Sequence, residues 1–200
     1  MNAKFFDLKK EKQDRMINAA LKVFALHGYR HASTDDIVHE AAISKGLLFH
    51  YFGSKLGVYS FVYDYSVRYM TLELKSTVDA GETDMFTLVK QEECARMHAM
   101  RGYPYMQQFL NRSMSEDVSE ALLAIEEKRN ILLETYEGIR GRMDFAVLPA
   151  GIDGEKIYKM LDLTIKGLMT EHFQDASFQP EMLYEEIVNY VDMMKQIVYK

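Results

Sequence analysis

Apolar residues recur at three- and four-residue spacing along most of the chain, the pattern of helices that bury one face. The first stripe contains Ile17, Leu21 and Phe24 and predicts a helix over residues 9–27. Gly28 follows it and suits a left-handed C-terminal cap. No run of alternating polar and apolar residues is bounded by hairpin turns, so we expect no sheet.

The same periodicity, read between breaks at glycine and proline, predicts the remaining helices. They are expected at residues 34–41, 45–51, 55–78, 84–101, 104–112, 116–143, 154–173 and 180–199. The sequence therefore predicts an all-α fold of about nine helices. We expect a three-helix domain over residues 1–55 and a helical body over residues 56–200, joined through the long helix 55–78.

Two short helices joined by the three-residue turn 42–44 are what a helix-turn-helix requires. Ser33 and Ser44 stand at the N-cap positions, and we expect Ser33 to accept a hydrogen bond from the backbone N–H three residues on. Asp36 would complete a variant of the capping box. Gly46 is unfavourable inside a helix, so it suits a close approach of backbone to another surface, here DNA.

Several groups around the second short helix suit a phosphate backbone. The helix N-termini offer free N–H groups. Lys45 and Lys55 bracket the helix with positive charge, and His50 and Tyr51 can donate hydrogen bonds. Taken singly, these are also features of two capped helices in an ordinary bundle.

The whole constellation strongly resembles the N-terminal DNA-binding domain of TetR-family transcriptional regulators. The residues that carry the resemblance are Phe24, Gly28, Tyr29, Ser33, Ile37, Ala41, Ile43, Ser44, Lys45, Gly46, Leu48, Phe49, His50, Tyr51, Phe52 and Lys55. The resemblance implies a homodimeric, all-helical regulator, usually a repressor. Three N-terminal helices would bind a palindromic double-stranded DNA operator, and the C-terminal domain would dimerise and bind a small molecule.

The resemblance also implies roles for individual residues. The DNA-binding set would be Ser33, Thr34, Ser44, Lys45, Gly46, Leu47, His50, Tyr51 and Lys55. Residues 45–47 would face base edges or backbone, and the others would hold phosphates. Phe24, Ile37, Leu48 and Phe52 would form the domain core.

Three positions depart from the usual family pattern. Ala42 replaces the common turn glycine, so it must avoid a left-handed conformation or adopt it at some cost. Leu47 stands where threonine is frequent and could contact a thymine methyl instead. Phe49 replaces a frequent tyrosine and loses its hydroxyl. The operator sequence therefore cannot be read from this helix.

The last two helices carry apolar stripes that alone are more typical of core than of an interface. The resemblance implies instead that these helices pair in a four-helix bundle between two copies. The expected interface residues are Ile157, Leu161, Leu168, Leu183, Ile187, Tyr190, Met194 and Ile197. A two-fold dimer would place two recognition helices about 34–36 Å apart, or a multiple of that spacing.

The body holds 12 of the 14 methionines, a residue type that adapts to ligands of varied shape. We hypothesise a ligand pocket, with simple core filling as an equal alternative for each residue. Its lining would be drawn from Met97, Met100, Tyr105, Phe109 and Tyr136. Cys94 and His98 share a helix face and could present a polar pair to a ligand or a metal, although this spacing usually has no function.

Charge divides unevenly along a chain of net charge −6. Residues 1–55 carry 9 Lys/Arg and 6 Asp/Glu, whereas residues 56–200 carry 15 and 24. An acidic body would repel phosphates and leave the N-terminal end as the attractive face. The sole cysteine, the lack of an apolar segment long enough for a membrane and the lack of a signal-peptide h-region fit a cytoplasmic protein.

We expect no enzyme, cofactor or metal site. No histidine follows a glutamate by three residues, as a di-iron bundle needs, and phosphate-loop and hydrolase motifs are absent. The pairs Glu92–Glu93 and Glu126–Glu127 are interpreted as solvated faces, since adjacent helical residues point apart. One alternative stays open: an architectural or division-associated DNA-binding protein of this fold without an inducer, which a body lacking a cavity would favour.

Overall fold

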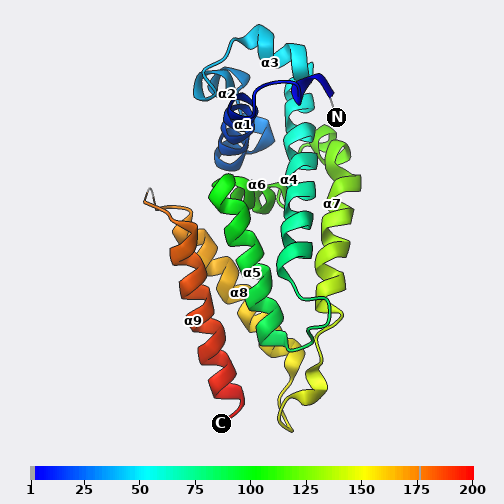
Figure 1. Cartoon of the computed structure of the whole chain (residues 1–200), viewed down its shortest axis with the longest axis vertical. Coiled ribbons are helices and arrows are strands. Elements are labelled where there is room, and N and C mark those ends of the chain that lie inside the picture. The colour runs from blue at the N-terminus through cyan, green and yellow to red at the C-terminus, as the bar shows by residue number, and fades with distance from the viewer. Residues whose placement is uncertain (1–2, 176) are drawn as a thin grey trace. The chain divides into compact units, whose positions relative to one another are not determined.

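The computed structural model describes residues 3–175 and 177–200, and within them every regular element is a helix (Figure 1). The helices there are η1 (Ala3–Phe5), α1 (Lys10–His31), α2 (Thr34–Glu40), α3 (Lys45–Phe52), α4 (Lys55–Thr77), α5 (Met85–Gly102), α6 (Met106–Ser113), α7 (Ser119–Arg140), η2 (Phe145–Val147), α8 (Gly154–His172) and α9 (Pro180–Val198). The all-α prediction is confirmed. Most expected helix ends lie within three residues of the observed ones.

The chain forms two compact units. Unit 1 comprises Met1–Tyr69 and Gly102–Leu133, and unit 2 comprises Met70–Arg101 and Glu134–Lys200. The helices α4 and α7 each contribute residues to both units. This division differs from the expected boundary at residue 55, because the first part of α4, α6 and much of α7 group with the helix-turn-helix.

The core of unit 1 is built from aromatic rings. Phe24 of α1 is fully buried, with ring centroids 5.0 Å from Tyr59 of α4 and 6.1 Å from Phe109 of α6. Tyr59 and Phe109 themselves pack edge to face at 5.5 Å. The core role expected for Phe24 is therefore confirmed. Phe109, a candidate pocket residue, instead fills this core.

Two glycines are required where unit 1 changes direction. Gly28 has φ +66°, so the helical path of α1 breaks there, as the predicted cap implies, although a last turn continues to His31. A side chain at Gly57 would place its Cβ 1.8 Å from the carbonyl oxygen of Phe52. Only glycine therefore allows α3 and α4 to approach so closely.

The N-terminal segment is part of the core of unit 1. Phe5 is fully buried, and its ring centroid lies 5.3 Å from that of Phe52 and 4.9 Å from that of Phe61. Gln13 Nε2 donates hydrogen bonds to the carbonyl oxygens of Phe6, at 3.1 Å, and Leu8, at 2.7 Å. The sequence did not predict this short helix. Its position depends on contacts such as that between Phe5 and Phe52, which are nearly fifty residues apart.

In unit 2, α8 and α9 pack side by side (Figure 1). Four of the expected dimer-interface residues, Leu161, Leu168, Leu183 and Ile187, are buried within the single chain. Helical periodicity identifies an apolar stripe but cannot tell whether the same chain or a second copy covers it.

Other apolar side chains on α8 and α9 remain exposed. Tyr190 and Ile197, both expected at the interface, are among them, whereas Ile157 and Met194 are half-buried. The further exposed apolar residues on these two helices are Met160, Leu163, Met182 and Met193. No helix in the described part of the chain is long and apolar enough to cross a membrane.

Candidate nucleic-acid interface

Both short helices of the helix-turn-helix begin at a serine cap. Ser33 Oγ accepts a hydrogen bond from Asp35 N at 3.1 Å, and Ser44 Oγ accepts one from Leu47 N at 3.2 Å. The cap at Ser33 therefore uses the N–H two residues on, rather than that of Asp36 as expected. Both helices start at the expected positions, and the other N–H groups of their first turns have no acceptor within the helix.

The turn between α2 and α3 contains Ala42 in a left-handed conformation, with φ +50°. Alanine there costs about 1–2 kcal/mol relative to right-handed backbone. The turn is held by hydrogen bonds from Ala42 N to the carbonyl oxygen of His39 at 3.1 Å and from Ile43 N to that of Val38 at 3.0 Å. The turn thus has the backbone conformation that a glycine would adopt, and Ala42 is strained in it.

Helix α3 buries one side and exposes the other. Leu48 is fully buried, while Lys45, Gly46 and His50 are exposed and Tyr51 is half-buried. A Cβ built on Gly46 would meet no atom of the described chain within 4 Å. Packing within the chain therefore does not explain a glycine here. The exposed side of α3 presents most of the residues expected to read DNA.

Lys45 is engaged in an ion pair on this exposed side. Its Nζ lies 2.8 Å from Asp35 Oδ1, and both side chains are mostly exposed. An exposed pair of this kind contributes little to stability, so an incoming phosphate could replace the carboxylate at small cost.

Lys55 occupies a different position from the one expected of a phosphate clamp. Its Nζ donates to the carbonyl oxygens of Tyr29, at 2.9 Å, Ala32, at 3.3 Å, and Arg30, at 3.4 Å. The ammonium also lies 4.5 Å from the centroid of the Tyr29 ring. An ammonium has three N–H donors, and the three carbonyl oxygens of this chain can accept all of them. Lys55 ties the end of α1 to the start of α4.

Tyr29 is fixed from the other side by α7 and the residues before it. Its backbone N–H donates to Glu116 Oε2 at 3.0 Å, and its hydroxyl donates to Glu120 Oε1 at 2.6 Å. Burial and the Glu120 carboxylate raise the pKa of Tyr29 to about 12, so the hydroxyl remains a donor at neutral pH. The last turn of α1 is thereby held by Lys55 on one side and by Glu116 and Glu120 on the other.

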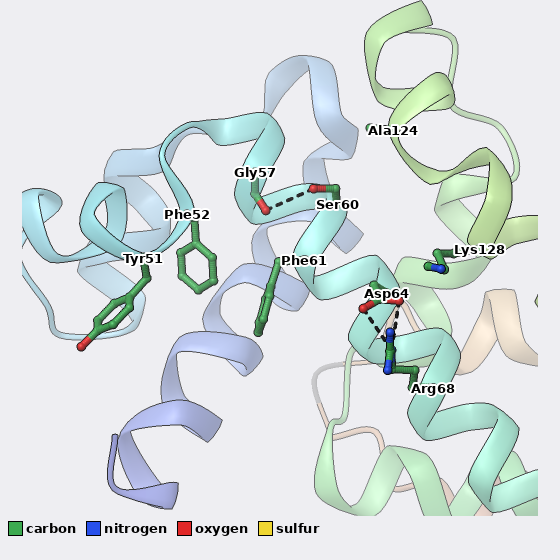
Figure 2. A pocket seen from close by; sticks show the side chains of 9 residues that line it. All are labelled: Tyr51, Phe52, Gly57, Ser60, Phe61, Asp64, Arg68, Ala124 and Lys128. Atoms are coloured by element: carbon green, nitrogen blue, oxygen red, sulfur yellow. Dashed lines mark hydrogen bonds and ion pairs between the residues drawn. The ribbon is translucent and has the colours of Figure 1, made fainter. Parts of the chain in front are cut away.

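A cleft of about 430 Å³ opens beside the helix-turn-helix within unit 1, large enough for a small ligand (Figure 2). Aromatic side chains from α3 and α4 line one part, and charged side chains from α4 and α7 line the other. Its lining residues are Tyr51, Phe52, Gly57, Ser60, Phe61, Asp64, Arg68, Ala124 and Lys128. Arg68 Nε lies 3.1 Å from both Asp64 oxygens, so these charges already satisfy each other. The sequence did not predict this cleft.

Unit 2 buries charges that were interpreted as solvated. Glu93 is 3% exposed and accepts a hydrogen bond from Arg96 Nη1. Arg96 Nε also donates to the Tyr136 hydroxyl at 3.3 Å, and the guanidinium lies 4.8 Å from the centre of the Tyr136 ring. The interpretation of Glu92–Glu93 as a solvated face is therefore wrong. Adjacent side chains on a helix do point apart, but neighbours on several sides of α5 bury both.

Glu92 differs from Glu93 in having no partner. It is 5% exposed, and within residues 3–175 and 177–200 no donor is hydrogen-bonded to its carboxylate. Burial raises the pKa of Glu92 to about 7, against the opposing effect of Arg96. Perturbed, buried carboxylates of this kind gather at functional sites.

The candidate ligand residues are divided between the two units. Met97 and Met100, both buried, and Tyr136 belong to unit 2, while Tyr105 and Phe109 belong to unit 1. Neither unit brings the five together by itself, so the pocket they would form remains a hypothesis.

The Cys94–His98 pair does form, with Sγ and Nε2 3.7 Å apart. His98 Nδ1 in turn lies 3.7 Å from Glu73 Oε2. In the part of the chain that the structure describes, no cluster of three or more His, Cys, Asp or Glu side chains could hold a metal ion.

Comparison with known proteins places this geometry in context. Residues 16–60 match the family described as bacterial regulatory proteins, tetR family. The HTH-type transcriptional regulator SrpR of Pseudomonas putida is 22% identical over 173 residues, which are 86% of this chain and 80% of SrpR.

Solved structures share the fold. A TetR family transcriptional regulator from Chloroflexus aurantiacus superposes with a TM-score of 0.60 at 23% identity, over 98% of this chain and 92% of that one. The transcriptional regulator FadR of Bacillus subtilis, solved in complex with stearoyl-CoA, gives 0.56 at 15% identity, over 88% and 96%. These proteins are transcriptional regulators, a class that is not enzymatic, which confirms that expectation.

The internal role of Lys55 makes a prediction about stability. Replacing Lys55 by Met leaves three backbone carbonyls without their donor, so the free energy of unfolding should fall by about 1–3 kcal/mol. Lys45→Met is the matched control, because its exposed ion pair should change stability by less than about 0.5 kcal/mol. Urea unfolding followed by circular dichroism measures both. Equal stability of the two variants would show that Lys55 does not anchor α1.

Proposed function

We propose that this chain, whose N-terminal domain is similar to the DNA-binding domain of the TetR family, is a homodimeric repressor that a small-molecule ligand releases from DNA. Two copies would bind a palindromic operator in the cytoplasm, each placing α3 in the major groove. The DNA contacts proposed are those expected from the sequence, with Lys55 acting chiefly through the position of α1 and α4.

The main support for a DNA-binding site on α3 is that Gly46 lies on the exposed side of this helix. A glycine in a helix lowers stability, and nothing in the described chain needs the space beside it. The space is explained if the backbone of α3 lies against DNA. Lys45 and His50, exposed on the same helix, are in place to contact phosphates or base edges.

Exposed apolar residues of α8 and α9 support the dimer. Leu163 is 57% exposed and Ile197 is 59% exposed, and Met160, Met182 and Met193 extend the same exposed set. Monomeric proteins rarely expose so many large apolar side chains on two neighbouring helices. A second copy would cover them. We therefore place these exposed residues at the interface. The four buried residues expected there from the sequence are Leu161, Leu168, Leu183 and Ile187.

Ligand control would work by shifting a population of conformations. FadR of Bacillus subtilis was solved with stearoyl-CoA, which supports a small-molecule site in this chain as well. The ligand would favour a form in which the two α3 helices are wrongly spaced for the operator. The helix α4 belongs to both units and begins at Lys55, so it is the proposed route of the change.

Replacing the glycine on α3 should change fold stability and operator affinity in opposite directions. Gly46→Ala should stabilise the fold by about 0.5 kcal/mol yet weaken operator binding roughly tenfold, because the added methyl obstructs contact with DNA. Gly138→Ala on α7 is the control, since its Cβ also meets nothing within 4 Å, and it should gain stability without losing affinity. Thermal unfolding and fluorescence anisotropy, on a duplex selected by the wild type, measure the two quantities.

Two results would contradict the DNA site. One is a Gly46→Ala variant that binds as tightly as the wild type. The other is unchanged operator affinity in a Lys45→Ala, Tyr51→Ala double variant.

The dimer surface predicts the effect of charge on α8 and α9. Leu163→Glu combined with Ile197→Glu should convert the dimer to a monomer, because burying the two carboxylates at the interface is costly. Leu123→Glu, at a more exposed position on α7, should leave the dimer intact. Sedimentation velocity separates the two species. A double variant that remains dimeric would place the interface elsewhere.

A further inference from the structure

Three of the residues that line the cleft beside the helix-turn-helix are small: Gly57 and Ser60 on α4 and Ala124 on α7. A larger residue at position 57 is excluded, since its Cβ would lie 1.8 Å from the carbonyl oxygen of Phe52. Ser60 Oγ donates to the Gly57 carbonyl oxygen at 3.3 Å, so its side chain is turned back onto α4. The cleft of about 430 Å³ is therefore set by helix packing within unit 1, and its size is that of a small-molecule site.

Aromatic rings form one end of this cleft (Figure 2). The ring centroids of Phe52 and Phe61 lie 4.8 Å apart, and the fully buried ring of Phe5 packs against both. Tyr51 adds a third lining ring, 6.4 Å from that of Phe52. Phe52 and Tyr51 are only half-buried, so part of this aromatic surface is open to contact. A planar apolar group can pack against rings that are already held in place.

Charged side chains form the other end of the cleft (Figure 2). Arg68 neutralises Asp64 through its Nε alone, which lies 3.1 Å from both carboxylate oxygens. Among the described residues no acceptor is hydrogen-bonded to the two terminal nitrogens of Arg68. These nitrogens carry four N–H donors in a planar arrangement that suits a second carboxylate.

Lys128 gives this end of the cleft a net positive charge. The charged lining consists of the positive Arg68 and Lys128 and the negative Asp64. Lys128 Nζ lies 2.8 Å or less from only one acid, Glu127, at 2.7 Å; that side chain is 80% exposed and is not part of the lining. An exposed ion pair contributes little to stability, so a ligand could replace Glu127 at small cost. The cleft therefore favours an anion over a cation.

We propose that this cleft is a binding site for an aromatic carboxylate. The ring of the ligand packs against Phe52 and Phe61. Its carboxylate pairs with Lys128 and accepts hydrogen bonds from the terminal nitrogens of Arg68. The site shares no residue with the ligand pocket expected from the sequence, and all of its lining belongs to unit 1.

Occupation of the cleft lowers operator affinity through Tyr51. This residue lines the cleft and is also one of the proposed contacts to DNA. A ligand ring packed against Tyr51 holds its side chain in the cleft, so the hydroxyl cannot also reach a phosphate. The effect on the operator rests on the proposed regulatory function, whereas the binding of the ligand does not.

Three probes that share one ring system test the charge preference: 2-naphthoate, neutral 2-naphthol and cationic 2-naphthylmethylammonium. In isothermal titration calorimetry of the full-length protein at neutral pH, naphthoate should bind on the order of tenfold more tightly than naphthol, and the cation more weakly than both. Lys128→Gln should remove most of the preference for naphthoate and leave naphthol binding unchanged. Lys156→Gln, which breaks a surface ion pair with Asp153 on α8, is the control and should alter neither.

Filling the cleft tests its position independently of charge. Ala124 is exposed at the wall of the cleft, so Ala124→Trp should fold normally and place an indole ring where the ligand binds. Naphthoate and naphthol should both bind about tenfold more weakly, or worse. Leu123→Trp, on the same helix but outside the lining, should bind both as the wild type does. Circular dichroism verifies that each variant is folded.

Fluorescence anisotropy on a duplex selected by the wild type separates the site from its effect on DNA. Saturating naphthoate should weaken operator binding by about three- to tenfold in the wild type, and should have no effect on Ala124→Trp. Equal binding of the three probes, or unchanged naphthoate binding in folded Ala124→Trp, would overturn the site and leave operator binding untouched. Cleft-dependent naphthoate binding by a protein that binds no operator would support the site and overturn the regulatory function. Unchanged operator affinity with naphthoate in the cleft would overturn the competition for Tyr51.

Discussion

The last turn of α1, from Gly28 onward, determines where the DNA-reading helices lie. Gly28 turns the chain with a positive φ, and the ammonium of Lys55 then draws together the carbonyl groups of the following residues. Tyr29 is held on its other side by Glu116 and Glu120. Because α2 and α3 follow this turn and α4 starts at Lys55, the geometry of the helix-turn-helix depends on one lysine and one tyrosine.

The chain uses charge in two different ways. On α3 the Lys45–Asp35 pair is exposed, contributes little to stability and can be exchanged for a contact with phosphate. In unit 2 the Glu93–Arg96 pair is buried and held by Tyr136, so it is fixed. Surface charge of the first kind suits a site that must bind and release a large polyanion. Buried charge of the second kind belongs to the interior of unit 2, where its partners are side chains of the same chain.

Capping and apolar periodicity predicted the helices, but the roles of individual side chains depend on contacts between residues distant in sequence. Ser44 and the apolar spacing around Leu48 were sufficient to place α3, because capping and periodicity act within a few residues. The partners of Lys55 lie more than twenty residues away, so its internal role could not be read from the sequence. The burial of Glu92 likewise depends on helices distant in sequence. Ile187 and Ile197 occupy similar apolar positions on α9, yet only folding shows that the first is core and the second exposed.

We propose that two copies of this chain read one symmetric operator through α3. Selection of bound duplexes from a random-sequence DNA pool is the decisive experiment. We expect an enriched inverted repeat whose half-sites are about 10–10.5 base pairs apart, centre to centre, or a multiple of that. A Gly46→Ala protein should enrich the same repeat more weakly. Enrichment of a single unrepeated half-site, or of no sequence at all, would show that two copies do not read a symmetric operator.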